Sequence, residues 1–375
     1  MKSIQNEITA LRSDSSFTIS NHYNCRHAVV LNESDKSKTA YCFSVPIRNK
    51  ETKNLVDFKF HHNNLNCMYY GSNSNISIRD SIVFQNQYGN CSISFPGRLE
   101  KKTISKLFFS TDVGKMEISP TLNGLYFKMY YSKNHFPVIK LTGNSPHKTK
   151  SNDKYFALMA EQFKPLITVS CIGTYNQDNM LIAPCQVQAI VETNGRYTLS
   201  ITSPVKTGSS IAFEINMHEP KLLQDTTVES KHATTNNAYG GIAYLGNSVF
   251  YEEQWLYSRL EYTLLDQFQN KKIRKAILHL PNLNHSQTPL ILNQTTTRFC
   301  SFGSNWNNKV PISKSVGAIS ITPEFYNIDL TSILQNEMNT SNNFVIRVKD
   351  QHQSAVMIPT ADSYYHPQIL ELNFR

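Results

Sequence analysis

The stretch YSRLEYTLLD, residues 257–266, alternates between large apolar side chains and polar or charged ones. Leu260 and Leu264 fall on one side of a two-residue period, whereas Arg259 and Glu261 fall on the other. Successive side chains of a β-strand point to opposite faces of the sheet, so this alternation predicts a strand with one buried face. An arginine beside so many aromatic and aliphatic side chains then requires an explanation from catalysis, binding or structure.

The same strand signal recurs along most of the chain. Short runs rich in Val, Ile, Tyr, Phe and Thr are separated by Gly, Asn, Asp or Pro, a pattern typical of strands joined by turns. Asn123-Gly124 and Asn194-Gly195 lie between such runs and are strong signals for hairpin turns. We therefore predict an all-β fold with two β-sandwich, jelly-roll-like regions and few short helices.

Two segments have helical spacing instead. In KYFALMAEQFKPL, residues 154–166, apolar side chains recur three to four positions apart until Pro165 ends the pattern. TSILQNEM, residues 331–338, also has a helical pattern, and Thr331 is a residue type that often caps a helix N-terminus. We expect one short helix in each segment.

The chain of 375 residues is long enough for two or three domains. A polar run, GNSPHKTKSND at residues 143–153, is typical of a linker or a long loop. We predict an N-terminal β-sandwich region at residues 1–150 and a C-terminal jelly roll at residues 221–375. Residues 151–220 are too few for a comfortable core of their own, so we expect them to complete or bridge the first region.

Composition excludes a wholly disordered chain, because 40% of the residues are hydrophobic and 11% are aromatic. The net charge is +9, and the excess lysines are spread along the sequence rather than massed in one block. Nucleic-acid binding normally needs basic residues clustered on one face, so we predict no specific nucleic-acid partner. An anionic cell wall or an acidic polysaccharide is compatible with this charge.

The seven cysteines show no metal-binding spacing, and their odd number leaves at least one outside any intramolecular disulfide. Cys42 and Cys300 lie in apolar runs, where a free cysteine behaves as a small hydrophobic residue. We expect buried, reduced thiols, with a partial set of disulfides as the alternative. We predict no metal site and no cofactor.

The beginning of the sequence lacks the apolar core of a signal peptide, and no run approaches the roughly 18 apolar residues that a membrane-spanning helix needs. We therefore predict no membrane span. A cell-surface or particle-associated location is favoured, and the compartment stays open. The protein could reach such a location by another export route, as the mature part of a precursor that had a signal peptide, or by assembly into a particle inside the cell.

A series of short motifs occurs in a characteristic order in the C-terminal part, residues 222–375. They are DTTVES (225–230), TTNNAYGGIAYLG (234–246), SRLEYTLLD (258–266), KAILHLP (275–281), SNWNNKVP (304–311), YNIDLTSIL (326–334) and YYHPQILELNF (364–374). Together they resemble the DNRLRE-type domain, which is classed with carbohydrate-binding β jelly rolls. The β-rich residues upstream are similar to the segment that precedes such domains in surface proteins of low-GC Gram-positive bacteria.

Arg259 has a structural explanation in this pattern. A guanidinium within an otherwise apolar strand keeps its charge and can satisfy several acceptors in fixed geometry. Asp329, between Ile328 and Leu330, is a suitable partner because burial of one charge without its pair is costly. We predict an Arg259–Asp329 ion pair, with exposed separate charges or a functional site as the alternatives.

Trp306 is the main candidate for ligand binding. Sugar-binding sandwiches place an aromatic face against the C–H face of a pyranose ring, and flanking amides bind the hydroxyl groups. The alternative is that Trp306 plugs one end of the sandwich. The candidate ligand-binding set is Trp306, with Asn305, Asn307 and Asn308 as the amides and Tyr364 and Tyr365 as a second platform.

No recognised catalytic motif occurs in the sequence, which lacks Gly-x-Ser-x-Gly, His-Glu-x-x-His and a phosphate-binding glycine loop. Glu252 and Glu253 are adjacent, and adjacent side chains on a strand point to opposite faces, which does not suit a glycosidase pair. Cys25 and His27 share a strand face, but nothing local supplies an orienting acid or oxyanion donors. We predict no catalytic residue.

These observations favour a non-catalytic extracellular or surface-associated β-sandwich protein that binds carbohydrate or acts in adhesion. Its expected partner is a polysaccharide or a cell-wall glycan. The alternative is a structural subunit that self-assembles or joins partner proteins in an extracellular assembly, such as a phage tail, an injection machine or a surface filament. A polysaccharide-acting enzyme is the third and least favoured alternative.

Overall fold

Antiparallel strands dominate the protein, which confirms the predicted all-β class. The chain forms two compact units: the first is built around Asn49–Glu219, and the second combines Ile4–Arg48 with Pro220–Arg375. The first unit is therefore an insertion between two parts of the second. The computed structural model describes residues 3–12, 17–20, 22–23, 25–63, 66–131, 138–268, 271–337, 342–350 and 355–375.

Two antiparallel sheets form the first unit, and they pack face to face. Phe156 of one sheet lies against Tyr197 of the other, with ring centroids 5.1 Å apart. The smaller sheet has the described strand order β18-β19-β13-β8-β7-β6-β5-β4. Its strands are β4 (His61–His62), β5 (Cys67–Tyr70), β6 (Asn75–Ile78), β7 (Ile82–Asn86), β8 (Gly89–Ser94), β13 (Ile139–Asn144), β18 (Gln186–Val191) and β19 (Arg196–Thr202).

The larger sheet of the first unit has the described order β14-β15-β16-β20-β12-β11-β10-β9, with β17 paired to β16. Its central strands are buried on both faces: all of β20 and all but the first residue of β16 are buried. The strands are β9 (Arg98–Lys102), β10 (Leu107–Thr111), β11 (Gly114–Pro120), β12 (Gly124–Tyr131), β14 (Lys148–Ser151), β15 (Tyr155–Glu161), β16 (Lys164–Tyr175), β17 (Leu181–Ala183) and β20 (Ser210–Met217).

Both predicted Asn-Gly hairpins are confirmed. Leu122 and Asn123 lie in the turn between β11 and β12, Gly124 is the first residue of β12, and the Thr121 N–H donates to the Gly124 carbonyl at 2.9 Å. Gly195 lies in the turn between β18 and β19 with a φ of 84°. Glycine adopts this positive φ without a steric penalty, which explains its place in the turn.

The predicted helix at residues 154–166 is wrong. This segment forms the hairpin of β15 and β16, in which Pro165 pairs with Met159. Both strands bury side chains on both faces, so apolar residues at helical spacing are present without a helix. The polar run at residues 143–153 is not a linker either, because it contains the end of β13 and the whole of β14.

The second unit also consists of two antiparallel sheets. One has the described order β1-β2-β3-β31-β24-β28-β27, and the other has the order β26-β25-β29-β23-β22-β30, with β21 paired to β23. The first sheet contains β1 (Thr18–Ile19), β2 (Ala28–Asn32), β3 (Lys38–Phe43), β24 (Ile273–Pro281), β27 (Ile319–Ile321), β28 (Phe325–Asp329) and β31 (Ile369–Phe374). The second sheet contains β21 (Leu223–Glu229), β22 (Ile242–Ser248), β23 (Glu252–Leu260), β25 (Leu290–Thr295), β26 (Ile312–Ser315), β29 (Asn343–Val348) and β30 (Val356–Pro359).

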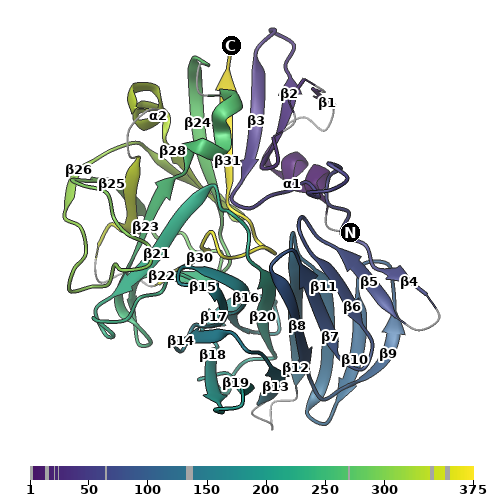
Figure 1. The fold of residues 1–375 in the computed structure, drawn as a ribbon. Helices are drawn as coiled ribbons and strands as arrows, with labels where there is room; N and C mark the ends of the chain where they lie inside the picture. The colour runs from purple at the N-terminus through teal and green to yellow at the C-terminus, as the bar shows by residue number, and fades with distance from the viewer. Residues whose placement is uncertain are drawn as a thin grey trace. The chain divides into compact units, whose positions relative to one another are not determined.

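Strand β31 joins the two parts of the second unit. It pairs with β3 on one side, where Lys38 lies opposite Phe374, and with β24 on the other. In Figure 1 the yellow β31 accordingly lies between the purple β3 and the green β24. The division into units differs from the predicted one at the N-terminal part: residues 4–48 belong with the C-terminal strands rather than with the predicted region 1–150. Residues 151–219 belong to the first unit, together with residues 49–150.

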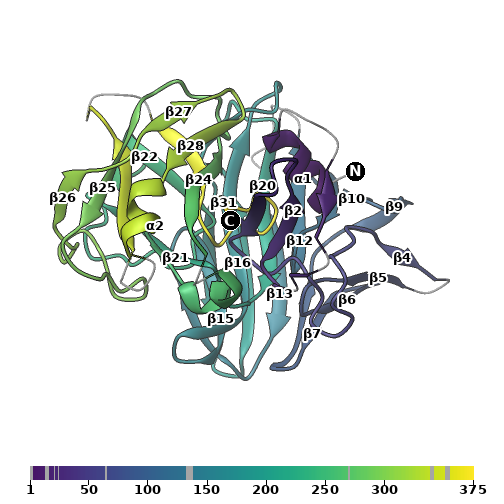
Figure 2. The same ribbon diagram turned by 90° about the horizontal axis from the view of Figure 1, so that it is seen from above.

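Helices are few in the described chain. α1 (Ile4–Leu11) and α2 (Thr331–Glu337) are α-helical, and η1 (Tyr262–Phe268) is a 3-10 helix. The predicted helix at the start of TSILQNEM is confirmed, and Figure 2 shows α2 beside β24. Thr331 is not its cap, however, because the Asp329 carboxylate accepts the Thr331 N–H at 2.8 Å.

The strand that contains Arg259 is confirmed only as far as Leu260, where β23 ends. The predicted alternation over residues 257–266 does not continue, because η1 follows. Within β23 the two faces are distinct: Leu256 belongs to the core between the sheets, whereas Tyr257 belongs to a second apolar cluster. Both faces of β23 are therefore packed against other residues, and neither is simply exposed to solvent.

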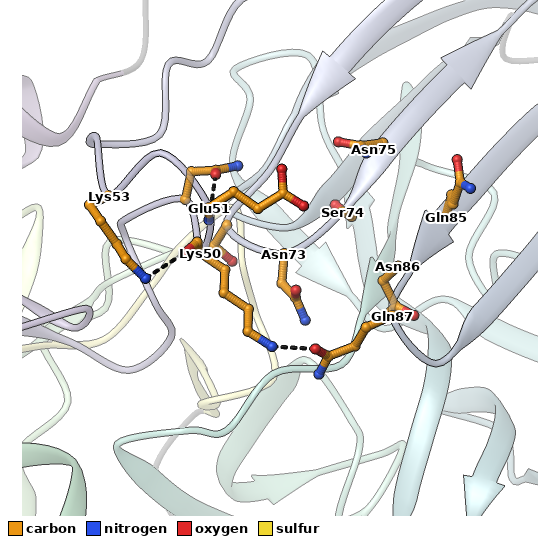
Figure 3. Close-up of a pocket in the computed structure, with 11 residues that line it drawn as sticks. Lys50, Glu51, Lys53, Asn73, Ser74, Asn75, Gln85, Asn86 and Gln87 are labelled. Carbon is orange, nitrogen blue, oxygen red and sulfur yellow. Dashed lines mark hydrogen bonds between the residues drawn. The ribbon is translucent and has the colours of Figure 1, made fainter.

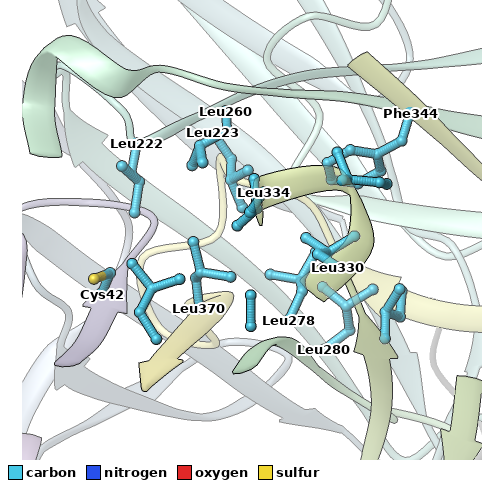
Figure 4. Packing of buried hydrophobic residues seen from close by; sticks show 14 of the residues in the cluster. Cys42, Leu222, Leu223, Leu260, Leu278, Leu280, Leu330, Leu334, Phe344 and Leu370 are labelled. Atoms are coloured by element: carbon cyan, nitrogen blue, oxygen red, sulfur yellow. The ribbon is translucent and has the colours of Figure 1, made fainter. Parts of the chain in front are cut away.

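An apolar core lies between the two sheets of the second unit, as Figure 4 shows. β24 and β31 contribute Leu278 and Leu370, and β23 and β29 contribute Leu260 and Phe344. Leu334 of α2 packs into the same core, and each of these five side chains is at most 4% exposed. Burial of one such side chain is worth about 1.5–3 kcal/mol, so this core is the main stabilising feature of the unit.

All seven cysteines are free thiols. Six are buried, including Cys42, but Cys300 is exposed, although Phe299 and Phe302 lie close to it in the sequence. The neighbouring Phe299 is the residue that packs into the cluster around Tyr257. In the part of the chain that the structure describes, no helix is long and apolar enough to cross a bilayer.

We expect Gly124→Ala to destabilise the first unit. A Cβ at this position would lie 2.6 Å from the Cα of Asn216 on the paired strand β20, so the backbone would have to shift. Overpacking of this kind costs about 1–3 kcal/mol. Thermal unfolding should show a lower midpoint, whereas Gly303→Ala, with its nearest neighbouring atom 3.6 Å away, should unfold like the wild type. An unchanged midpoint in Gly124→Ala would contradict the close approach of β12 and β20.

Candidate functional site

Trp306 packs on the outer face of the sheet that contains β23. Its ring lies 5.3 Å from the ring of Trp255. The Lys309 ammonium is 3.8 Å from the centre of the Trp306 ring, a cation–π contact that occupies one face of the indole. Both tryptophans border a buried cluster of Val228, Tyr257, Phe299 and Val345. This packing gives Trp306 structural contacts on the outer face of the sheet, rather than a position at one end of the sandwich.

The asparagines around Trp306 shape the turn itself. The Asn305 side-chain oxygen accepts the N–H groups of Asn307 and Asn308, at 3.0 and 3.2 Å. Asn308 accepts the Asn305 N–H at 2.7 Å and donates to the Gly303 carbonyl at 3.0 Å. Two of the three proposed sugar-binding amides are therefore engaged within the turn, and Asn307 is exposed.

Tyr364 and Tyr365 do not form an open aromatic platform. Tyr364 is 2% exposed, so no face of its ring is accessible to a sugar. Tyr365 is half-buried, and the ring of His366 lies edge-on to it at 4.9 Å. Burial therefore removes Tyr364 from the candidate ligand-binding set.

Arg259 pairs with Glu261 and not with Asp329. Its guanidinium lies 3.3 Å from the Glu261 carboxylate and donates to the Phe299 carbonyl at 3.4 Å. Asp329 lies on β28 in the other sheet of the unit, where it accepts the Thr331 N–H at the start of α2. The predicted ion pair is corrected for this reason: the two strands belong to different sheets, and a carboxylate two residues away is within reach of the guanidinium.

A polar pocket in the first unit has the clearest binding chemistry. Its volume is about 440 Å³, and its walls come from residues 49–53, 72–75 and 85–87. The eleven lining residues are six amides, three charged residues and two serines. Figure 3 shows side chains from the three segments around a common space. The pocket therefore presents a dense set of hydrogen-bond donors and acceptors.

Hydrogen bonds fix the loop that forms one wall of this pocket. The Asn49 side-chain oxygen accepts the N–H groups of Glu51 and of the next residue, both at 3.0 Å. The Asn49 side-chain nitrogen donates to the Gly71 carbonyl at 2.9 Å. The Lys50 ammonium donates to the Gln87 side chain, as the dashed line in Figure 3 shows. These bonds hold the loop against the turn after β7.

Two further amides in the pocket, those of Asn75 and Gln85, are open to a ligand. Asn75 on β6 lies directly opposite Gln85 on β7, and both residues are exposed. Directly opposed residues of an antiparallel pair project their side chains on the same face. The Asn86 side-chain nitrogen is buried and has no hydrogen-bond partner within the described residues. A molecule with several hydroxyl groups could pair with the exposed amides of Asn75 and Gln85.

The carboxylates considered for catalysis have structural contacts instead. Glu253 accepts the Trp255 indole N–H at 2.8 Å, and Glu252 accepts the Ser230 hydroxyl at 3.1 Å. Across the described residues, no group of three or more His, Cys, Asp or Glu side chains is arranged to hold a metal ion.

Cys25 and His27 are both buried in the second unit. The Cys25 thiol donates to the Leu264 carbonyl at 3.5 Å, and His27 Nδ1 lies 3.2 Å from the Phe43 carbonyl, to which it donates. Burial lowers the pKa of His27 to about 4, so the imidazole is neutral near pH 7. Both side chains therefore bond to the backbone around them, which favours a structural role.

Neither a protein-family model nor a curated protein matches the chain. The resemblance to DNRLRE-type domains stays a prediction from the sequence motifs. The functional assignment therefore depends on the geometry of the chain itself.

The polar pocket is not among the sites predicted from the sequence, although two sequence runs that form it are rich in amides. The amide-rich runs SNSN at residues 72–75 and QNQ at residues 85–87 form two of its walls. Asn and Ser are also common in turns, so such runs do not by themselves indicate a site. The pairing of β6 with β7 is what brings the two runs together.

We expect the second unit to lose stability in acid as His27 becomes protonated. The pKa of the imidazole is about 4 in the folded chain, against its ordinary value of 6.5, so the unfolded chain binds more protons between these values. Above pH 6.5 the imidazole is neutral in both the folded and the unfolded chain, and His27 causes no loss of stability. As the pH falls from 6.5 toward 4, the free energy of unfolding decreases by up to about 3 kcal/mol. Urea unfolding at pH 7 and at pH 4.5 measures this loss.

His27→Asn is the control for this prediction, because asparagine keeps a side-chain N–H donor but does not titrate in this range. The wild type should lose about 2 kcal/mol more unfolding free energy than the variant between the two pH values. An equal loss in both proteins would contradict the buried, neutral state of His27.

Proposed function

We propose that this protein is a non-catalytic, surface-associated β-sandwich protein that binds a neutral carbohydrate in the polar pocket of its first unit. The observation that carries this proposal is the lining of the pocket: six amides, two serines and three charged residues surround about 440 Å³. Apolar ligands would leave these donors and acceptors unpaired, whereas a molecule rich in hydroxyl groups pairs with them.

Size and charge narrow the ligand class. Small-ligand sites commonly have volumes of about 300–1,000 Å³, and this pocket falls toward the lower end of that range. Lys50 donates to Gln87, and Lys53 donates to the Lys50 carbonyl at 2.6 Å. Both ammonium groups are thus engaged within the protein, and Glu51 offsets part of their charge. A short neutral oligosaccharide is therefore the expected ligand.

The second unit supports the same class of function through its sequence. Its motifs resemble the DNRLRE-type domain, and that resemblance implies a carbohydrate-associated jelly roll in a surface protein. A cell-wall glycan or another surface polysaccharide is therefore the proposed partner. Trp306 is the weaker candidate site, because Lys309 occupies one face of its ring.

A structural subunit of an extracellular assembly is the second candidate function. β18 lies at the end of the strand order in its sheet and exposes Ile190 and Val191, by 69% and 45%. Edge strands with exposed apolar side chains readily pair with another chain. Sedimentation of the wild type and of Ile190→Lys tests this function: assembly through β18 predicts a defined oligomer that the charged variant loses, and a monomer in both cases argues against it.

The double variant Asn75→Ala/Gln85→Ala should lose carbohydrate binding while it keeps its fold. Both residues are exposed, so truncation should change stability by less than about 0.5 kcal/mol. Removal of two hydrogen-bonding amides should weaken affinity by about 10–100-fold. A glycan array identifies the responding oligosaccharide, and titration calorimetry with that oligosaccharide measures the change.

Gln188→Ala is the matched control, because it removes an exposed amide from β18 in the same unit but outside the pocket. It should bind like the wild type. Binding that survives in the double variant but disappears in Trp306→Ala would move the site to the tryptophan turn. An array without any response would reject carbohydrate binding, and hydrolysis of a glycan by the pure protein would reject the non-catalytic role.

A further inference from the structure

Three ionisable side chains lie together in the interior of the second unit. Lys221 precedes β21, Asp225 belongs to β21, and Asp362 lies between β30 and β31. These residues are 5%, 2% and 2% exposed. Lysine and aspartate are almost never fully buried unless they are paired, so a buried group of three requires an explanation.

Lys221 and Asp362 are in direct contact, and Asp225 is close enough for their charges to influence its pKa. The Lys221 ammonium contacts one carboxylate oxygen of Asp362. One oxygen of Asp225 accepts the N–H of Ala361, the residue beside Asp362, at 2.6 Å. The ring of Tyr239 lies 5.9 Å from the Lys221 nitrogen and helps to enclose it. An amine and two carboxyl groups are thus held within one buried site.

One oxygen of each carboxyl group has no hydrogen bond of normal geometry within the described chain: Oδ1 of Asp225, although the Gln368 side chain lies near this carboxyl group, and Oδ2 of Asp362. A buried carboxylate oxygen without a partner carries a large desolvation cost. A salt bridge between Lys221 and Asp362 leaves that cost in place. Protonated carboxyl groups reduce it, and an uncharged covalent product removes the two charges altogether.

The protonation states favour chemistry at this site. Burial, and after it the charge of Asp362, raise the pKa of Asp225 to about 7. Burial also raises the pKa of Asp362, although the Lys221 charge opposes this effect. Asp225 is therefore protonated in a large fraction of molecules near neutral pH and can act as an acid beside the Lys221–Asp362 pair.

We propose that Lys221 and Asp362 condense to an intramolecular isopeptide bond, with Asp225 as the acid that assists the reaction. A proton first passes from the Lys221 ammonium to the Asp362 carboxylate, which gives a neutral amine beside a neutral carboxylic acid. The amine nitrogen then attacks Cγ of Asp362. Protonated Asp225 donates a hydrogen bond to the carbonyl oxygen and so stabilises the charge that develops there.

The atoms of this reaction balance without another reactant. The bond that forms joins Lys221 Nζ to Asp362 Cγ, and the bond that breaks joins Cγ to one carboxyl oxygen of Asp362. Asp225 gives a proton to the departing hydroxyl group and takes one from the nitrogen, so it ends the reaction unchanged. The products are one amide and one water molecule.

Burial on both sides of the contact distinguishes this lysine from another lysine of the chain. Lys128 is also buried and donates to the side chain of Asn179, but Asn179 is exposed. At Lys221 the two reacting groups are enclosed and in contact, which turns an encounter between separate molecules into an intramolecular step. Exclusion of water from the site also opposes hydrolysis of the product.

The bond would join positions that are 141 residues apart in the sequence. It would fasten the segment that enters β21 to the segment that leads into β31, and so cross-link the second unit. This proposal is independent of the proposed carbohydrate function, because it uses different residues in the other unit. Failure of one therefore leaves the other in place.

Mass spectrometry of the intact, denatured wild-type protein tests the proposal. The mass should be lower than the sequence mass by one water molecule, about 18 Da, because condensation releases water. A tryptic digest should contain a branched peptide that joins Lys221 to Asp362. Asp225→Asn keeps both partners but removes the acid, so it should have the full sequence mass. Lys128→Arg is the matched control at another buried lysine and should keep the mass deficit.

A wild-type protein with its full sequence mass would show that the two side chains form an ion pair only, which overturns the proposal. A deficit that persists in Asp225→Asn would overturn the role of Asp225. Lys221→Arg keeps the positive charge but cannot form this bond. Its thermal midpoint should lie below that of the wild type by on the order of 10 °C, whereas a mere ion pair predicts a much smaller shift.

Discussion

The pairing of β31 with β3 on one side and β24 on the other is the interaction on which the second unit depends. It brings Lys38–Phe43 beside Ile369–Phe374, so both parts of the unit contribute to one sheet. The core beneath this sheet contains Ala40 from β3 as well as Leu278 from β24. Without β31 the two parts would no longer be joined in one sheet, and both would expose apolar side chains to water.

The local elements of the fold were largely predictable, because turn chemistry and a period of two act over a few residues. The Asn-Gly pairs at residues 123–124 and 194–195 identified their hairpins for this reason. The same logic failed at residues 154–166. β15 is buried on both faces over Tyr155–Met159, so no exposed polar side chain in this part of the strand reveals a period of two.

Long-range partners were less accessible to sequence reasoning. Asp329 matched Arg259 in charge, but strand order placed it in another sheet, and Glu261 became the partner. The polar pocket depends on a loop and two strands that meet only through the register of β6 and β7. The contact between Lys221 and Asp362 likewise depends on how distant segments meet. Such contacts follow from tertiary packing, and neither composition nor spacing contains that information.

The inserted position of the first unit has a consequence for synthesis on the ribosome. Residues 4–48 emerge before the insert, yet their pairing partner β31 is made after it. At about 5–20 residues per second, roughly 15–65 s separate the two events. The insert is contiguous in sequence and can collapse during that delay, whereas the nascent N-terminal strands wait with an open edge. The first unit can therefore fold during synthesis before the sheet of the second unit is complete.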